Sequence, residues 1–360
     1  MPRTLPQPET VEIETADGVV LRCRRYRRPG ARAFVCGHGQ ASCGYEFDLP
    51  LAGFQLSQTL YDLGYEVWLV NFRGAGHAPW RSDEGGWRNS GDELGALDLP
   101  AVIDRVVEET GQAPFYFGHS YGGMALYAYL QGAVMERGSI TVTRDDEVAR
   151  ERNKKIAGGL TAGSPLAMSD DAPDWRERLR RHPWVQSLMR RVERYLIRRS
   201  KTRPVIQIGR LSLRVGFRHP LLARLVMYSP LMKIYMRPEQ MGFEACGLFG
   251  TWAGGDVTCV HLAQTVQTVR KGELTTLEIE GQETLSYEEG MSNITAPLAA
   301  AAGEKDFMRP EDIKEKVLGA VSSEQTLFLP IKGCGHIDML FHMPLAEIAD
   351  WLEWAAAERS

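Results

Sequence analysis

The chain has 360 residues, 44% of them hydrophobic, and a formal net charge of −4 at pH 7. This length and composition suit one large α/β domain with an insertion, or two domains, around a sizeable core. The small negative charge excludes a global attraction to nucleic acid, and no run of 18 uncharged apolar residues is present to span a membrane.

The N-terminus and the cysteines bear on the compartment. Residues 1–10 are polar and proline-containing, so no signal peptide is expected. The cysteines lack C-x-x-C spacing, which argues against a zinc site and, without secretion, predicts reduced thiols. The sequence therefore predicts a cytoplasmic protein without a metal; its six cysteines are Cys23, Cys36, Cys43, Cys246, Cys259 and Cys334.

Predicted strands and helices alternate along the first part of the chain. A two-residue turn at Asp17-Gly18 predicts a hairpin of strands 11–15 and 19–26. We expect further strands at 31–36, 65–71, 115–117 and 156–161, and helices at 54–63 and 92–109, the second kinked at Pro100. A helix end and a surface loop are expected within 132–155. This order predicts a mainly parallel, doubly wound sheet whose ligands bind at the carboxyl ends of the strands.

The alternation stops at residue 164 and resumes near residue 293. The intervening stretch is mostly helical in pattern and rich in arginine and proline. We therefore divide the chain into a core (1–164), an inserted helical lid (165–292) and the rest of the core (293–360). The last part carries strands at 294–302 and 326–329 and helices at 310–321 and 344–358.

A G-x-S-x-G pentapeptide, Gly118-His119-Ser120-Tyr121-Gly122, follows the strand at 115–117 and precedes a helical stretch. Strand, sharp turn and helix are the context of a nucleophile elbow, in which small residues let strand and helix approach closely. The Ser120 hydroxyl would then project into a pocket as a nucleophile.

A serine nucleophile needs a base to take its proton and an acid to orient that base. In the chain order serine, acid, histidine, each partner should follow a late strand, which predicts Asp306 and His336. Asp170 or Asp171, after the preceding strand, could orient the same histidine instead.

The reaction also needs N–H donors for an oxyanion. The backbone N–H of Tyr121 is one candidate, and the N–H of Gln40, in the turn Gly37-His38-Gly39-Gln40, is the other. We interpret His38 as structural. The glycine-rich loop at 73–77 lacks the full dinucleotide-binding fingerprint, so no cofactor is expected.

Residues 175–203 form a basic amphipathic pattern with many arginines and an apolar face at helical spacing. This helix could pack over the pocket, lie on an anionic membrane surface, or bind an acidic protein. Residues 221–236 are rich in Leu and Met, which suits contact with flexible acyl chains or simple core packing.

On these motifs the chain resembles the α/β-hydrolase superfamily and, within it, the acid lipases, the gastric and lysosomal enzymes that act on triacylglycerols and cholesteryl esters. The shared phrases lie within about residues 30–165 and are Gly37-His38-Gly39, Tyr65-Glu66-Val67-Trp68-Leu69, Arg73-Gly74, Asp98-Leu99-Pro100-Ala101 and Gly118-His119-Ser120. Polyhydroxyalkanoate synthases are more distantly similar, but they use cysteine at the elbow, where this chain has Ser120. Gln40 stands where the acid lipases have an apolar residue.

The sequence thus predicts a serine hydrolase that cleaves a hydrophobic carboxylic ester through an acyl-enzyme, with peripheral membrane contact through residues 175–203 as a further possibility. The alternatives are an acyltransferase or a thioesterase with the same three residues, and a binding protein that keeps the fold without the chemistry.

Overall fold

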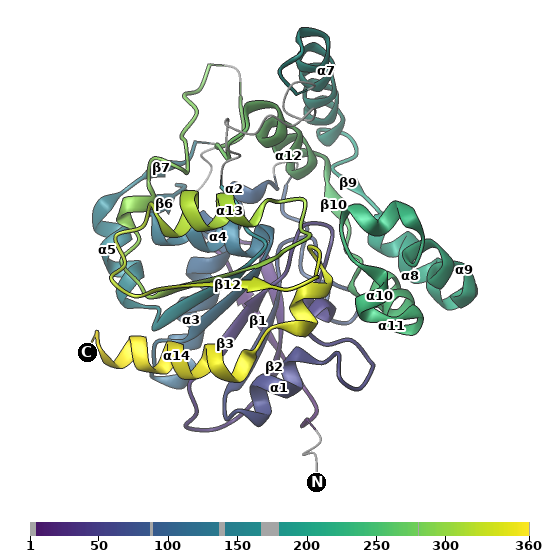
Figure 1. The fold of residues 1–360 in the computed structure, drawn as a ribbon. Helices are drawn as coiled ribbons and strands as arrows, with labels where there is room; N and C mark the ends of the chain where they lie inside the picture. The colour runs from purple at the N-terminus through teal and green to yellow at the C-terminus, as the bar shows by residue number, and fades with distance from the viewer. Residues whose placement is uncertain (1–4, 87–88, 137–140, 167–179, 280, 360) are drawn as a thin grey trace.

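A computed structural model of the chain describes residues 5–86, 89–136, 141–166, 180–279 and 281–359. The central feature of this part of the chain is an eight-stranded sheet (Figure 1). From β3 to β12 its strands run parallel, and β2 joins β1 and β4 in antiparallel pairs. The strands, in their order across the sheet, are β1 (Glu9–Glu14), β2 (Val20–Tyr26), β4 (Glu66–Asn71), β3 (Ala33–Gly37), β5 (Phe115–His119), β8 (Gly158–Ala162), β11 (Leu298–Gly303) and β12 (Thr326–Ile331).

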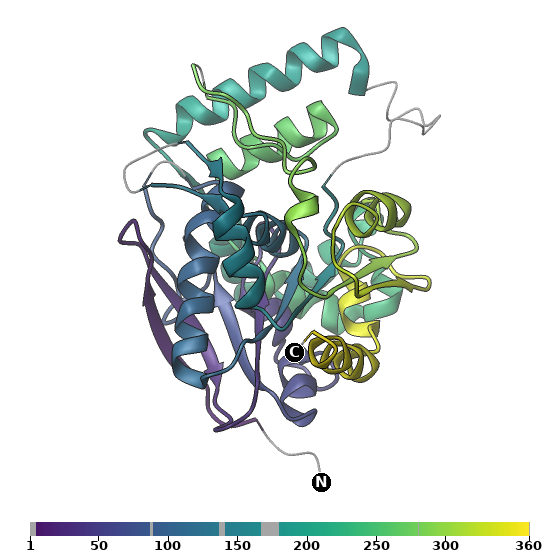
Figure 2. The same cartoon turned by 90° about the vertical axis from the view of Figure 1, so that its left-hand side faces the viewer.

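Helices cover both faces of this sheet (Figure 2). In β4, Trp68 and Val70 join the core cluster under α3 (Leu99–Thr110) and α4 (Tyr121–Leu130). Val67 and Leu69, which alternate with them, join the cluster under α1 (Leu56–Asp62) and α14 (Leu345–Ala357). The central apolar residues of β4, at positions 67–70, thus bury both faces, as expected for a parallel sheet between two helical layers. The doubly wound fold predicted from the sequence is confirmed.

Where a kink at Pro100 was expected, the structure has a π-helical segment, η2 (Leu94–Asp98), between α2 (Gly91–Glu93) and α3. The N–H of Leu99 donates to the carbonyl oxygen of Leu94, five residues earlier, which is the π-helical spacing. This irregular turn lies next to Pro100, which has no N–H for the regular helical pattern.

One local prediction was wrong: residues 132–155 were expected to be a helix end and a surface loop. They include a small antiparallel pair, β6 (Ala133–Val134) with β7 (Thr143–Arg144), and a helix, α5 (Asp146–Lys154). The Asp145 carboxylate accepts hydrogen bonds from Glu147 N and Val148 N, which caps α5. The charged residues of this stretch therefore lie largely in the helix α5 rather than in a loop.

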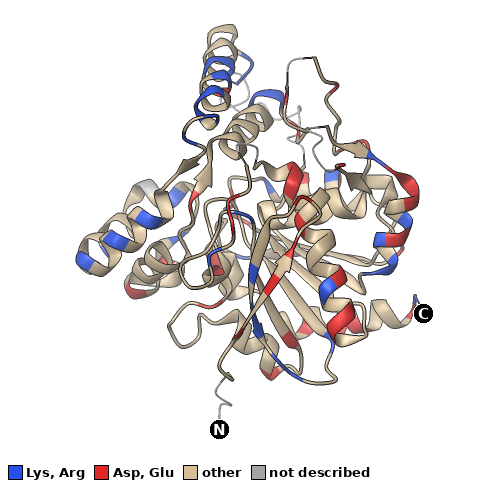
Figure 3. Ribbon diagram, turned by 180° about the vertical axis from the view of Figure 1, so that it is seen from behind, with Lys and Arg blue, Asp and Glu red and all other residues tan. Residues whose placement is uncertain are grey.

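The chain between β8 and β11 is mainly helical where it is described, and its helices lie beyond the strand ends and to one side of the sheet (Figure 1). Basic residues are frequent on α7 and α8 (Figure 3). The segments are α7 (Pro183–Ser200), β9 (Val205–Ile206), α8 (Ile208–Arg218), α9 (Pro220–Met227), η3 (Pro230–Ile234), α10 (Pro238–Met241), α11 (Phe243–Leu248), η4 (Phe249–Ala253), β10 (Val257–Thr258), α12 (Cys259–Lys271) and η5 (Met291–Asn293).

A buried carboxylate anchors part of this helical stretch to the core. Asp92, in α2, accepts hydrogen bonds from Gln264 Nε2 at 2.8 Å, from Tyr287 OH at 2.9 Å and from Leu277 N at 3.0 Å, and it is fully buried. Gln264 also accepts from Gly91 N. Because buried polar groups are costly to leave unpaired, these bonds fix α12 against α2.

Beyond β11 the chain adds α13 (Pro310–Asp312), a π-helical segment η6 (Ile313–Leu318), and η7 (Asp338–His342) before α14. All six cysteines are buried and free of disulfide bonds. Among the described residues, no helix combines the length and the apolar composition that a membrane-spanning segment requires.

Candidate active site

Ser120 lies at a sharp turn between β5 and α4, with φ 51° and ψ −117°. Its N–H donates to Ala162 O at 2.8 Å, and its carbonyl accepts from Gly123 N. A Cβ on Gly122 would lie 2.1 Å from Gly37 O, so the close approach of α4 to the turn after β3 requires glycine there. The turn holds the Ser120 side chain at the carboxyl edge of the sheet.

A cavity of about 430 Å³ opens at this edge, and Ser120, His336, Gln40 and Tyr121 all line it. Its other walls are largely apolar and come from the helical stretch between β8 and β11 and from the loop after β11. They include Ile208, Met227, Met232, Tyr235, Phe249 and Phe307. Two methionines of the segment 221–236 therefore face the same space as the Ser120 side chain.

His336 follows β12, and Asp306 follows β11. Nδ1 of His336 lies 2.9 Å from Oδ2 of Asp306, whose side chain is fully buried. Oδ1 of Asp306 accepts from Met308 N at 2.9 Å, so both oxygens of the carboxylate are occupied. With Nδ1–H donating to Asp306, Nε2 of His336 is the basic nitrogen.

The loop that carries His336 is held by a second aspartate. Asp338 accepts from Gly335 N at 3.0 Å and from Arg237 N at 2.7 Å, and it is fully buried. The Asp338 carboxylate thus fixes the backbone before His336 and does not contact the His336 ring. The ring itself lies against Phe307 and His119, with centroid distances of 5.2 and 4.8 Å.

The two residues expected to supply oxyanion donors both line the cavity that contains Ser120. Within the described residues, neither the backbone N–H of Gln40 nor that of Tyr121 has a protein acceptor. The side chains of both residues meet at Thr265 in α12: Gln40 Nε2 lies 2.7 Å and Tyr121 OH 3.2 Å from its Oγ1. A residue of the helical stretch thus contacts both residues of the candidate oxyanion site.

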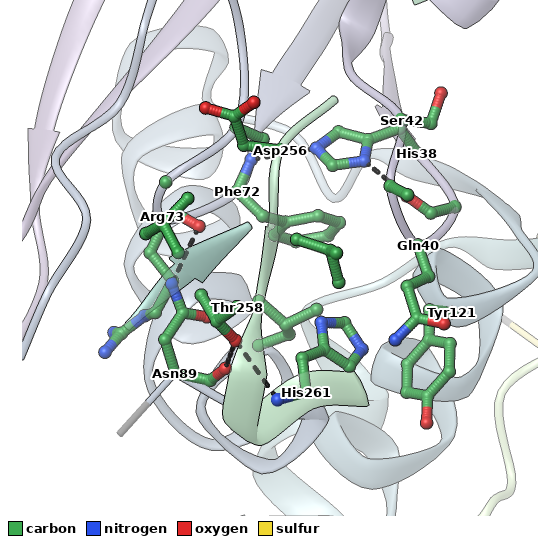
Figure 4. Close-up of a pocket in the computed structure, with 17 residues that line it drawn as sticks. His38, Gln40, Ser42, Phe72, Arg73, Asn89, Tyr121, Asp256, Thr258 and His261 are labelled. Atoms are coloured by element: carbon green, nitrogen blue, oxygen red, sulfur yellow. Dashed lines mark hydrogen bonds between the residues drawn. The ribbon is translucent and has the colours of Figure 1, made fainter. Parts of the chain in front are cut away.

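Next to Gln40 a smaller cavity of about 30 Å³ lies between the turn after β3 and the start of α12 (Figure 4). His38 is buried there, its Nδ1 facing Gly39 O and its Nε2 accepting from Phe72 N. Burial lowers the pKa of His38, and burial lowers that of His261 to about 3. Both histidines are therefore neutral, and the bonds of His38 hold the turn in place, as its structural interpretation requires.

Ser120, His336, Gln40 and Tyr121 line one cavity, and Asp306 contacts His336 from behind its lining. Ser120 Oγ and His336 Nε2 form no hydrogen bond with each other in the described residues, as is common without a bound substrate. The alternative acids, Asp170 and Asp171, lie outside the described residues.

Sequence reasoning missed three polar residues that contact this site: Glu46, His119 and Thr265. His119 occupies the variable position of G-x-S-x-G and belongs to a phrase shared with the acid lipases, but no role was assigned to it from the sequence. Glu46 and Thr265 had no motif, because their contacts join residues 73 and 225 positions apart in the chain.

Comparisons with known proteins agree on the fold. A family model described as alpha/beta hydrolase fold matches residues 33–136. The chain is 35% identical to Lipase 1 of Drosophila melanogaster over 122 residues and 35% identical to human gastric triacylglycerol lipase over 128 residues. The matched segments cover 32% of this chain in both cases, and 28% and 32% of those lipases, so the chain spans about a third of the length of these relatives.

Solved structures resemble a much larger part of the chain. A monoacylglycerol lipase of Paleococcus ferrophilus matches with a TM-score of 0.54 and 17% identity, covering 94% of this chain and 98% of that protein. A thermophilic esterase of Thermogutta terrifontis matches with a TM-score of 0.54 and 15% identity over 97% of this chain and 99% of its own. At these identities the likeness concerns the fold alone.

Proposed function

We propose that this chain, which has the α/β-hydrolase fold, is a serine hydrolase that cleaves carboxylic esters with a large apolar acyl group. One observation carries the proposal: Ser120, at a strained turn, shares a cavity with His336, whose Nδ1 faces the buried Asp306 carboxylate. The same cavity holds Gln40 and Tyr121, whose backbone N–H groups have no acceptor among the described residues. We take Asp306, rather than Asp170 or Asp171, as the acid because its carboxylate lies 2.9 Å from Nδ1 of His336.

The chemistry follows from these positions. Ser120 Oγ attacks the ester carbonyl while His336 Nε2 takes the hydroxyl proton, and the Asp306 carboxylate stabilises the imidazolium. The N–H groups of Gln40 and Tyr121 stabilise the oxyanion. His336 then returns the proton to the leaving alkoxide, which leaves an acyl-enzyme. Water, deprotonated by His336, attacks this ester, and the acid departs as Ser120 regains its proton.

The cavity favours an apolar acyl group because methionine and aromatic side chains form much of its wall. A volume of about 430 Å³ is enough for an extended chain of several carbons rather than for acetate alone. Relatives named as triacylglycerol and monoacylglycerol lipases support the same substrate class.

The helical stretch assigned to 165–292 is, in this proposal, a lid that supplies most of the apolar wall. Its helix α7 packs on α12 through Leu196 and lines no part of the cavity within the described residues, which weakens the idea that it covers the pocket. Trp184, Leu188 and Tyr195 are instead exposed beside many arginines. We therefore favour contact of α7 with an anionic lipid surface, although residues 175–179 of the expected helix lie outside the described residues. The cytoplasmic location stays a prediction.

The deciding experiment compares wild type with Ser120→Ala on p-nitrophenyl esters of increasing acyl length, together with fluorophosphonate labelling and mass mapping. Loss of the nucleophile should lower kcat by about a millionfold. Turnover that depends on Ser120 and rises with chain length is expected. Labelling without turnover would favour acyl transfer to another acceptor. The absence of both labelling and turnover would favour a binding protein.

A further inference from the structure

Beside Ser120, a buried histidine and a buried glutamate lie outside the proposed proton path. Nδ1 of His119 is 2.9 Å from Oε1 of Glu46, and Nε2 of His119 is 3.1 Å from the carbonyl oxygen of His336. The side chains are 4% and 1% exposed, so solvent hardly reaches either one. Two such groups next to a nucleophile call for an explanation.

The partners of His119 determine its protonation. A carbonyl oxygen only accepts, so Nε2 must carry a proton to bond His336 O. Glu46 Oε1 also accepts from Gly39 N at 3.1 Å, which favours its ionised form and leaves the second proton on Nδ1. His119 is therefore an imidazolium that donates from both nitrogens.

Charges around the pair agree with this assignment. Burial by itself lowers the pKa of His119, but the Glu46 carboxylate and its hydrogen bond outweigh burial, so the pKa of His119 is raised above 6.5. Burial likewise opposes ionisation of Glu46, yet the charge and hydrogen bond of His119 hold its pKa below 4.5. The other titratable groups near the pair are Asp306, the ring of His336, His38 and the buried thiols of Cys36 and Cys43.

The pair joins three separate segments of the site. Glu46, in η1 (Gly44–Phe47), holds the N–H of Gly39 in the turn that presents Gln40. His119 precedes Ser120 on the elbow, and its second bond holds the backbone of His336. The oxyanion turn, the nucleophile and the base are thus connected through one imidazolium and one carboxylate.

We propose that His119 and Glu46 are positioning residues, which as an imidazolium–carboxylate pair hold the oxyanion turn and the His336 loop against Ser120. The inference rests on the proposed function. When His119 loses the Nδ1 proton, two lone pairs face each other at 2.9 Å, the Glu46 side chain is repelled, and Gly39 loses its acceptor. Ester hydrolysis should therefore fall at alkaline pH as His119 deprotonates.

The first test is the pH dependence of kcat for wild type, Glu46→Gln and a control, Glu347→Gln, on the exposed surface of α14. A glutamine keeps an oxygen for Gly39 N–H but carries no charge to hold the imidazolium. We expect the alkaline limb of Glu46→Gln to move at least about one pH unit lower, with kcat above that limb reduced about tenfold and KM changed little. The control should retain the wild-type profile.

The second test does not depend on turnover. In protein carrying ¹⁵N-histidine, the His119 ring, assigned by its loss in His119→Gln, should show two protonated nitrogens at pH 7. Its titration midpoint should match the alkaline limb of wild-type kcat, a comparison that holds even if Glu46→Gln fails to fold. A neutral His119 ring at pH 7, or an unshifted alkaline limb in folded Glu46→Gln, overturns the inference. Absent Ser120-dependent turnover overturns the proposed function instead, and the NMR result then decides the ionisation of the pair.

Discussion

Ser120 has a backbone conformation that costs about 1–3 kcal/mol for a residue with a side chain, and its neighbours compensate for that cost. Its N–H and carbonyl are both hydrogen-bonded, and glycines at 118 and 122 leave room for the backbone to pass. A Cβ at Gly118 would lie 2.5 Å from Gly123 N. The glycines that allow this strained conformation are part of the pentapeptide itself, so the elbow could be predicted from sequence.

The proposed role of Asp306 gives a test at the same scale. Asp306→Asn keeps the size of the side chain but removes the charge that stabilises the imidazolium and fixes its tautomer, so kcat should fall about 10⁴-fold. Asp170→Asn and Asp171→Asn are the matched comparisons, since either residue was an alternative acid from the sequence. Steady-state kinetics on a p-nitrophenyl ester measures all three. A large loss of kcat in Asp170→Asn or Asp171→Asn, with a near-normal kcat in Asp306→Asn, would identify that other aspartate as the acid that orients His336.

Among the elements, α12 connects the inserted stretch most directly to the candidate site. Gln264, fully buried, bonds to Asp92 and Gly91 of the core, and the next residue, Thr265, contacts the side chains of Gln40 and Tyr121. A helix held in this way is part of the cavity wall. By contrast, α8 and α9 expose many large apolar side chains.

We expect Thr265→Val to lower kcat on the order of tenfold with a small change in KM. The valine keeps the shape of threonine but removes the hydroxyl that hydrogen-bonds to the side chains of Gln40 and Tyr121. Each lost hydrogen bond should cost about 1 kcal/mol. Thr265→Ser retains the hydroxyl and should restore most of the rate. Equal losses in the two variants would mean that the methyl group, through packing, matters rather than the hydroxyl.

For the whole molecule, the exposed apolar residues are distributed unevenly. Most of the large ones lie in α7, α8, α9 and the segments up to residue 243, and few lie on the rest of the described surface. The same helices carry many of the arginines (Figure 3). Together these features suit a surface that meets anionic lipid, where the substrate would also be found.

Vesicle binding tests this contact. Trp184→Ser combined with Leu188→Ser removes two exposed apolar side chains from α7 and should weaken binding to phosphatidylserine-containing vesicles at least about tenfold, since each buried side chain contributes about 1.5–3 kcal/mol. Binding should also weaken as salt rises. Leu63→Ser, an exposed leucine at the end of α1, is the control. Unchanged binding by the α7 variant in a co-sedimentation assay would contradict the proposal.

Local chemistry determined much of this protein. The turn at Asp17-Gly18, the apolar strands and the elbow around Ser120 follow from short-range sequence patterns, because turn residues and burial periodicity act over a few positions. The order of strands after Ser120 then placed Asp306 and His336 at the same edge of the sheet. Where a charged stretch hid a helix, as at α5, composition alone misled, because the capping Asp145 and the contact with α4 decide the outcome.

Tertiary structure alone decided what surrounds those residues. The contacts of Glu46 with His119 and of Thr265 with Gln40 join segments far apart in the chain, and neither carries a sequence pattern. Whether α7 lines the cavity also depended on how the inserted helices pack. A sequence specifies which groups follow which strands, but the protonation of His119 and the shape of the cavity depend on neighbours that only the folded chain brings together.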